Sequence, residues 1–254
     1  MNKLSLLLKV RVRATIDGKA TMAKVPYRQL VGSLLHLANT TRPDIAFAAG
    51  LLSRHLESPE LCHWNAAKHV LRYLKGTATL GIQYNRDTSS SNTIDFHGYS
   101  DPDCEGDQNT RKSTSGFVFI LAGGAISWRS KKQTVTAQST VEAEYITFSY
   151  AIRELLWFRK MIEDVYGKRL QKTILYGDHQ GALSLASNEI QNERTKHIDV
   201  KYHFNKDYIA DHTVILQYVS TEKMTADVMT KALGSVKHRR CVEELGMKAA
   251  EERD

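Results

Sequence analysis

A strand-like run that ends in clustered acids constrains the fold of this chain more than any other feature. Residues 94–97 alternate apolar and polar side chains, which is the pattern of a half-buried strand. The segment 98–107 follows directly and contains four acidic residues within seven positions. A strand that ends in carboxylates and is followed by turn residues can project its charge into a cleft between neighbouring elements.

Three further acids stand at comparable positions downstream. Glu144 lies near the start of an amphipathic helix, Asp178 ends the strand-like run 173–178, and Asp227 lies on a late helical run. Carboxylates that come close together repel one another and need divalent cations between them. A carboxylate cage for Mg²⁺ is typical of phosphate chemistry. The sequence therefore predicts that these three acids converge with Asp101 in a metal site.

The order of the predicted elements indicates an α/β fold. Three strands are expected first, at 93–99, 116–121 and 125–128, with a glycine pair as the hairpin turn between the second and third. A long amphipathic helix follows, and then strands alternate with helices; these elements are expected at 138–166, 172–176, 180–186, 198–209, 213–219 and 225–233. This order predicts a five-stranded mixed sheet with helices packed on it.

A block of helices is predicted ahead of the sheet. Apolar residues recur at helical spacing, and Pro43 and Pro59 are placed where helices begin. The polar segment 87–92 then favours a linker. The predicted organisation is a poorly defined leader, an all-helical segment, the α/β domain and a flexible tail, at residues 1–24, 25–86, 92–233 and 234–254.

The composition indicates the cellular compartment of this chain but does not identify its activity. The formal charge of +7 is compatible with a polyanionic partner without requiring one. Three widely separated cysteines have no metal-ligand spacing, so a reducing compartment such as the cytoplasm is expected. The apolar start of the chain lacks a signal-peptide cleavage site, and no apolar run is long enough to span a membrane. We expect no membrane partner.

A set of motifs follows one order along the chain. They are Tyr-Ser-Asp at 99–101, Arg-Lys-Ser-Thr-Ser-Gly at 111–116, Ile-Ser-Trp-Arg-Ser-Lys-Lys-Gln at 126–133, Glu-Ala-Glu-Tyr at 142–145, Thr-Lys-His-Ile-Asp at 195–199 and Ala-Asp-Val-Met-Thr-Lys at 226–231. Together they resemble the ribonuclease H domain of Ty1/Copia-type retrotransposon Pol polyproteins. Residues 27–35 and 41–45 resemble the end of the reverse transcriptase that precedes this domain. The resemblance extends over roughly residues 25 to 233.

The resemblance implies a ribonuclease H-like fold and endonucleolytic hydrolysis of the RNA strand of RNA–DNA hybrids. It implies two Mg²⁺ ions, with Mn²⁺ as a possible substitute. It also implies that Asp101, Glu144 and Asp178 are catalytic metal ligands, with Asp227 as the fourth. Asp199 competes for that fourth place, and Asp227 is preferred because it follows the fifth strand.

Five further residues are candidates for substrate binding. Ser139, Thr140 and Gln180 flank the acids and can hydrogen-bond sugar or phosphate, where contact with a 2′-hydroxyl would distinguish RNA from DNA. Lys112 and Lys196 can contact phosphates. Each has a simpler reading as well, because Ser139 or Thr140 can cap a helix and basic loops are commonly solvated.

Departures from the family pattern leave other readings open. Cys104 replaces the usual aromatic residue, and His179 adds a bulky titratable side chain beside the acids. No Tyr-x-Asp-Asp polymerase motif occurs, so we expect no reverse transcriptase activity from this chain, which resembles a truncated Pol. The alternative is a catalytically inactive hybrid- or RNA-binding remnant. A transposase or integrase core, which has a three-acid pattern, fits the flanking motifs poorly.

The resemblance also sets expectations for partners and location. Beside the RNA–DNA hybrid, the remaining Pol and Gag components of the element are possible partners. The expected location is the cytoplasm, within a virus-like particle if the parent element is active. The basic cluster at 237–240 leaves the nucleus open, although a solvated basic tail explains that cluster equally.

Overall fold

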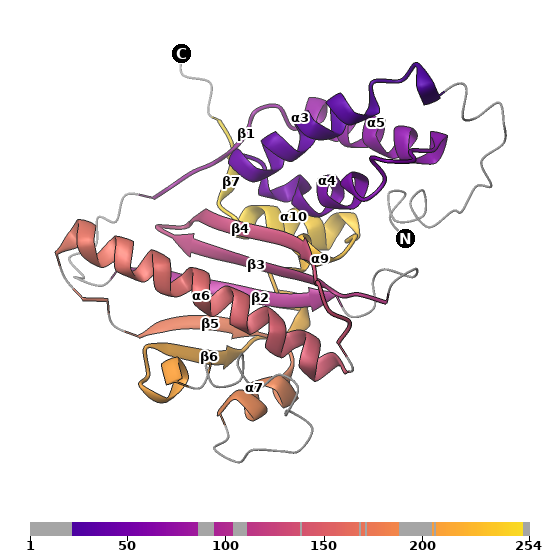
Figure 1. Cartoon of the computed structure of the whole chain (residues 1–254). Coiled ribbons are helices and arrows are strands. Elements are labelled where there is room, and N and C mark those ends of the chain that lie inside the picture. Colours follow the sequence, from indigo (N-terminus) through magenta and orange to yellow (C-terminus); the bar gives the residue numbers. More distant parts are fainter. Residues whose placement is uncertain are drawn as a thin grey trace.

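A mixed five-stranded sheet forms the centre of the computed structural model (Figure 1). The structure describes residues 22–85, 94–103, 111–137, 139–167, 169–170, 172–187, 205 and 207–250. The strand order is β4-β3-β2-β5-β6, with β2 and β3 antiparallel, β3 and β4 antiparallel, and β5 and β6 parallel to β2. The strands are β2 (Phe96–Asp103), β3 (Thr114–Leu121), β4 (Gly124–Lys132), β5 (Thr173–Gly177) and β6 (Val214–Tyr218). The predicted ribonuclease H-like fold is therefore confirmed.

Helix α6 (Thr140–Tyr166) crosses one face of this sheet (Figure 1). Ser139 caps the start of the helix, where its side chain accepts a hydrogen bond from the Glu142 amide. Gly167 caps the end of the helix with a φ of +67°. The apolar residues of α6 and of the sheet bury one another in a core that contains Phe117, Phe119, Phe148, Ile152 and Leu155, among others. The elements that carry Asp101, Glu144 and Asp178 are thus held together by one core between the sheet and α6.

A second core lies on the opposite face of the sheet. The predicted helical block is present there as α3 (Tyr27–Thr40), η1 (Pro43–Ile45), α4 (Ala46–Ser53) and α5 (Leu61–Gly76). Residues of these helices share one buried cluster with Val118 and Ile120 of β3 and with the C-terminal helices. The Trp128 indole on β4 also donates a hydrogen bond to the Ala38 carbonyl, 2.6 Å away. The helical block therefore has no core separate from the sheet.

The C-terminal segment is a correction to the sequence prediction. Residues 234–254 were expected to form a flexible tail, but α10 (Ser235–Glu244) and β7 (Met247–Ala249) are ordered elements. Strand β7 pairs antiparallel with β1 (Leu80–Ile82), and Cys241, Leu245 and Met247 are buried. The tail prediction was wrong because α10 is rich in basic residues, so the few apolar side chains that join the core give no clear helical pattern in the sequence.

Gly246 allows this segment to turn. Its φ is +75°, and a Cβ placed there would lie 2.3 Å from the Gly123 carbonyl oxygen. Only glycine tolerates both the left-handed backbone and this close approach. The chain can therefore pass directly from α10 into β7.

Two other predictions differ from the structure or fall outside it. The helix expected at 225–233 is shorter, since α9 comprises only Asp227–Thr230 and the backbone becomes extended at Lys231. A 3₁₀ turn, η3 (Thr221–Lys223), precedes it. Most of the expected helix 198–209, the leader up to residue 21, the whole linker 87–92 and the last four residues lie outside the described residues. Within the described part of the chain, every helix is too short or too polar to cross a membrane.

Candidate active site

Two of the predicted acids meet because their strands are parallel neighbours. Tyr99 of β2 is paired with Tyr176 of β5, and Asp101 and Asp178 each lie two positions beyond that pair. Both carboxylates therefore emerge at the same end of adjacent strands. Asp101 is 1% exposed, whereas Asp178 is half-buried and accepts a 2.8 Å hydrogen bond from the Thr221 hydroxyl.

Helix α6 supplies the third acid of this cluster. Glu144 lies in its second turn, and the helix packs over β2 and β3, so that the side chain reaches the ends of the strands. One oxygen each of Asp101, Glu144 and Asp178 lies within 4.8 Å of the others. Among the described residues, these three form the one group that could hold a metal ion.

The environment of the cluster disfavours negative charge. Burial is the largest cause, and together with the neighbouring charges of Asp101 and Asp178 it raises the pKa of Glu144 to about 9. Burial also raises the pKa of Asp101 to about 7, although Lys231 opposes this shift. One carboxylate oxygen of Glu144 has no hydrogen-bond partner within the described residues. Convergent oxygens of this kind are the donors that hard divalent cations such as Mg²⁺ take, so the residues fit a metal ion.

Asp227 is close to the cluster but is joined to it through a lysine. Its carboxylate is fully buried at the start of α9, 2.7 Å from the Lys231 ammonium. The same ammonium lies 3.0 Å from Asp101, and Lys237 also pairs with Asp227. Asp227 is not part of the three-carboxylate group. The structure thus brings the fourth predicted acid to the site with a positive charge in between.

A glycine on β3 permits this arrangement. A Cβ at Gly116 would lie 2.5 Å from the Thr230 side chain and 2.7 Å from that of Met229, so α9 approaches the sheet only because residue 116 has no side chain. The Thr230 hydroxyl in turn donates a hydrogen bond to Asp101. Gly116 therefore sets the distance between α9 and the acids.

The predicted substrate-binding residues are less constrained. Ser139 caps α6 through its side chain, and Thr140 and Gln180 are exposed at the first positions of α6 and of α7 (Gln180–Ser187). Lys112 donates a 2.5 Å hydrogen bond to the Thr134 carbonyl. Lys196 and the competing acid, Asp199, lie outside the described residues. The roles of these residues in substrate binding stay predictions.

His179 has a local structural role. Its ring nitrogen Nδ1 accepts a 3.1 Å hydrogen bond from the Ala182 amide in the first turn of α7, and the same amide also donates to the His179 carbonyl at 3.0 Å. A capping role explains why a histidine is accommodated next to Asp178. It also shows that this departure from the family pattern removes no carboxylate from the site.

Sequence reasoning missed Gln133 and Lys231. Gln133 is buried, and its amide nitrogen donates to the Ser115 hydroxyl at 2.9 Å and to the Ala143 carbonyl at 3.1 Å. These bonds tie the end of β4 to β3 and to the turn of α6 that carries Glu144. Lys231 was visible as the last residue of the motif 226–231, but its partners are distant in sequence and only the fold reveals them.

Comparisons with known proteins give strong sequence relatives, although no protein-family model matches the chain. The Retrovirus-related Pol polyprotein from transposon TNT 1-94 of Nicotiana tabacum is 41% identical over 233 residues, which is 92% of this chain and 17% of that protein. The chain thus spans a small fraction of that relative's length. Secreted RxLR effector protein 161 of Plasmopara viticola is 46% identical over 136 residues, 54% of this chain and 93% of that protein.

The structural comparison is weaker. LC11-RNase H1, isolated from compost, aligns over 55% of this chain and 94% of its own with 16% identity and a TM-score of 0.41. The fold assignment depends instead on the strand order and strand directions described above.

Proposed function

Because the chain belongs to the family of retrovirus-related Pol polyproteins from Copia-type transposons, we propose that it is a metal-dependent ribonuclease H. The proposed reaction is endonucleolytic hydrolysis of the RNA strand of an RNA–DNA hybrid. The observation that carries the proposal is the cluster of Asp101, Glu144 and Asp178 at the end of two parallel strands and one helix. A buried, unpartnered carboxylate oxygen on Glu144 supports metal binding at this point.

Each acid has a distinct part in the proposed site. Asp101 and Glu144 provide buried oxygens, and Asp178 provides one at the edge that solvent and substrate can reach. Divalent ions held there would act as Lewis acids on the scissile phosphate and lower the pKa of a bound water. We propose two Mg²⁺ ions, replaceable by Mn²⁺, with Asp227 as the fourth ligand. Lys231 holds Asp101 and Asp227 in place and offsets their repulsion.

The proposed substrate surface surrounds the exposed edge of the cluster. Ser139 and Thr140 at the start of α6 and Gln180 at the start of α7 are placed to hydrogen-bond sugar or phosphate, and helix N-termini favour anions. Lys112 and Lys196 are proposed phosphate contacts. Hydrolysis restricted to RNA requires that at least one group in this region recognises a 2′-hydroxyl.

The wider context follows from the family. The chain would act with the remaining Pol and Gag components of its element, in the cytoplasm or inside a virus-like particle, with the nucleus as the alternative location. These partners and locations are proposals, because the chain spans only 17% of the tobacco relative. Fluorescent tagging of the chain in cells that express the Gag component would test them.

A cleavage assay on a hybrid with labelled RNA tests the proposed function. We expect cleavage with Mg²⁺ or Mn²⁺, no cleavage in EDTA, and a loss of at least 100-fold with Asp178→Asn, which removes a half-exposed ligand without a core change. Asp164→Asn is the matched control, because Asp164 is exposed near the far end of α6, about 30 Å along the helix from Glu144. Equal cleavage by the protein and both variants, with and without metal, would refute the proposal.

The alternative, an inactive binding remnant, gives a different result in the same experiment. It predicts hybrid binding that weakens as salt rises, without cleavage in Mg²⁺ or Mn²⁺. The Lys231 bridge between Asp101 and Asp227 is the observation that favours it, because an ammonium already compensates part of the acidic charge. Measuring binding by fluorescence anisotropy alongside cleavage separates the two functions.

A further inference from the structure

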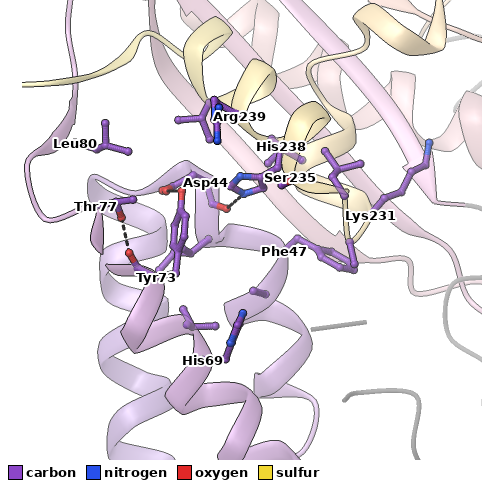
Figure 2. Close-up of a pocket in the computed structure, with 17 residues that line it drawn as sticks. Asp44, Phe47, His69, Tyr73, Thr77, Leu80, Lys231, Ser235, His238 and Arg239 are labelled. Atoms are coloured by element: carbon purple, nitrogen blue, oxygen red, sulfur yellow. Dashed lines mark hydrogen bonds between the residues drawn. The ribbon is translucent and has the colours of Figure 1, made fainter. Parts of the chain in front are cut away.

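A cavity of about 430 Å³ lies between the N-terminal and C-terminal helices (Figure 2). One wall comes from η1, α4 and α5, and the other from α9, α10 and the residues between them. Volumes of this size are typical of small-molecule sites in proteins. Neither the acidic cluster nor the proposed hybrid contacts account for this space.

Rings contribute much of the lining. Phe47 comes from α4, His69 and Tyr73 come from α5, and His238 comes from α10 (Figure 2). Tyr73 and His238 meet edge to face with their centroids 5.6 Å apart, which holds both rings at the cavity wall. Val70 and Leu233 add aliphatic surface. Such walls favour a flat aromatic body, which can stack on or meet the ring edges.

The charge of the lining is positive. Asp44 is the one acid among the described residues that line the cavity, and its carboxylate is already engaged. Arg42 donates to its two oxygens at 3.0 and 2.8 Å, and the Tyr73 hydroxyl donates at 2.6 Å. Arg239 lines the cavity and is exposed, and within the described residues no hydrogen bond or ion pair engages its guanidinium. An anionic group on a ligand would find this cation available.

We propose that the cavity binds a small aromatic anion, with its ring between Phe47 and Tyr73 and its carboxylate, sulfonate or phosphate against Arg239. The proposal does not depend on the nuclease reaction. The stem of Lys231 forms part of the wall, while its ammonium holds Asp101 and Asp227. An occupant would therefore touch the same side chain that bridges two acids of the metal site.

Two dyes with the same ring system, one anionic and one uncharged, test whether the anionic group of the ligand binds Arg239. Anilinonaphthalene sulfonate carries one anionic group, and N-phenyl-1-naphthylamine is its uncharged counterpart. In fluorescence titrations of the full chain we expect one sulfonate bound per chain and about tenfold weaker sulfonate binding with Arg239→Glu. The affinity for the uncharged dye should differ by less than about twofold between the protein and Arg239→Glu. Arg129→Glu is the control, since Arg129 is also exposed but lies on β4 outside this cavity.

A second variant tests the location. Ala48 lines the cavity from α4, and Ala48→Phe should fill part of it and weaken both dyes at least tenfold, with circular dichroism to verify the fold. If that variant does not fold, Arg239→Glu still decides the question, because it replaces an exposed side chain. Sulfonate binding that is unchanged by Arg239→Glu, or reduced equally by Arg129→Glu, would overturn the proposal.

Discussion

Glu144 should lower the stability of the metal-free protein, and replacing it with glutamine should raise that stability. The carboxylate is 4% exposed and lies beside Asp101 and Asp178. Its pKa is raised from 4.5 to about 9, so the folded protein binds the proton more tightly than the unfolded chain does. Stability therefore falls as the pH rises from about 4.5 to about 9, and the cost of ionising Glu144 is absent below this window.

The magnitude follows from the width of that window. Between the ordinary pKa and pH 7 there are about 2.5 pH units, and each unit corresponds to about 1.4 kcal/mol, so Glu144 should cost about 3–4 kcal/mol at pH 7. Glutamine has nearly the same shape, does not ionise, and can donate to the neighbouring carboxylates. We expect Glu144→Gln to be more stable at pH 7 by a value of this order, and by almost nothing at pH 4.5.

Urea denaturation in EDTA measures this difference directly. The protein, Glu144→Gln and the control Glu243→Gln would be unfolded at pH 5, 7 and 8.5; Glu243 is exposed on α10, so its replacement should change stability by less than about 0.5 kcal/mol. In Mg²⁺ the unchanged protein should become more stable than Glu144→Gln, because the ion binds to and stabilises the protein that has all its carboxylate ligands. A glutamine variant that is no more stable than the protein at pH 7, with a difference independent of pH, would refute the reasoning.

Three further predictions concern the packing that supports the site. Gly116→Ala should cost about 1–3 kcal/mol of stability and displace α9, because a Cβ there would clash with Thr230 and Met229. Gly32 lies in α3 with open space around it, so Gly32→Ala should be neutral or stabilising by about 0.5–1 kcal/mol. Thermal unfolding of the two variants measures the difference. Arg42→Ala should cost about 3–5 kcal/mol because it leaves Asp44 buried without its cation, and the double variant with Asp44→Ala should recover part of that loss in urea denaturation. Truncation after Gly234 should broaden or abolish cooperative unfolding, seen by circular dichroism, because it removes α10 and β7 from the shared core; an unchanged transition would contradict the packing described above.

Local sequence patterns determined the elements of this protein. The alternating and continuous apolar runs predicted all five strands of the central sheet, and the helical spacing predicted the N-terminal helices and α6. These patterns succeed because each strand or helix has to turn a regular set of its own side chains toward a core. The order of strands and helices along the chain then restricts the sheet to a mixed arrangement.

The sequence also singled out the acids, but not how each one is used. Asp101, Glu144 and Asp178 stand at the ends of predicted elements, and the parallel pairing of β2 with β5 places two of them side by side. Asp227 was selected for the same reason, yet Lys231 stands between it and Asp101. An ion pair across 130 positions depends on packing that no local pattern contains.

Only the tertiary structure decided the remaining features. The C-terminal segment looked like a basic tail because α10 carries few apolar residues, and its helix and strand become stable only when β1 and the N-terminal helices cover them. The close approach at Gly116 and the cavity between α5 and α10 likewise arise where distant segments meet. Preferences for helix or strand depend on neighbouring residues and can be predicted from the sequence. Contacts between remote segments depend on the shape and charge of the whole folded chain.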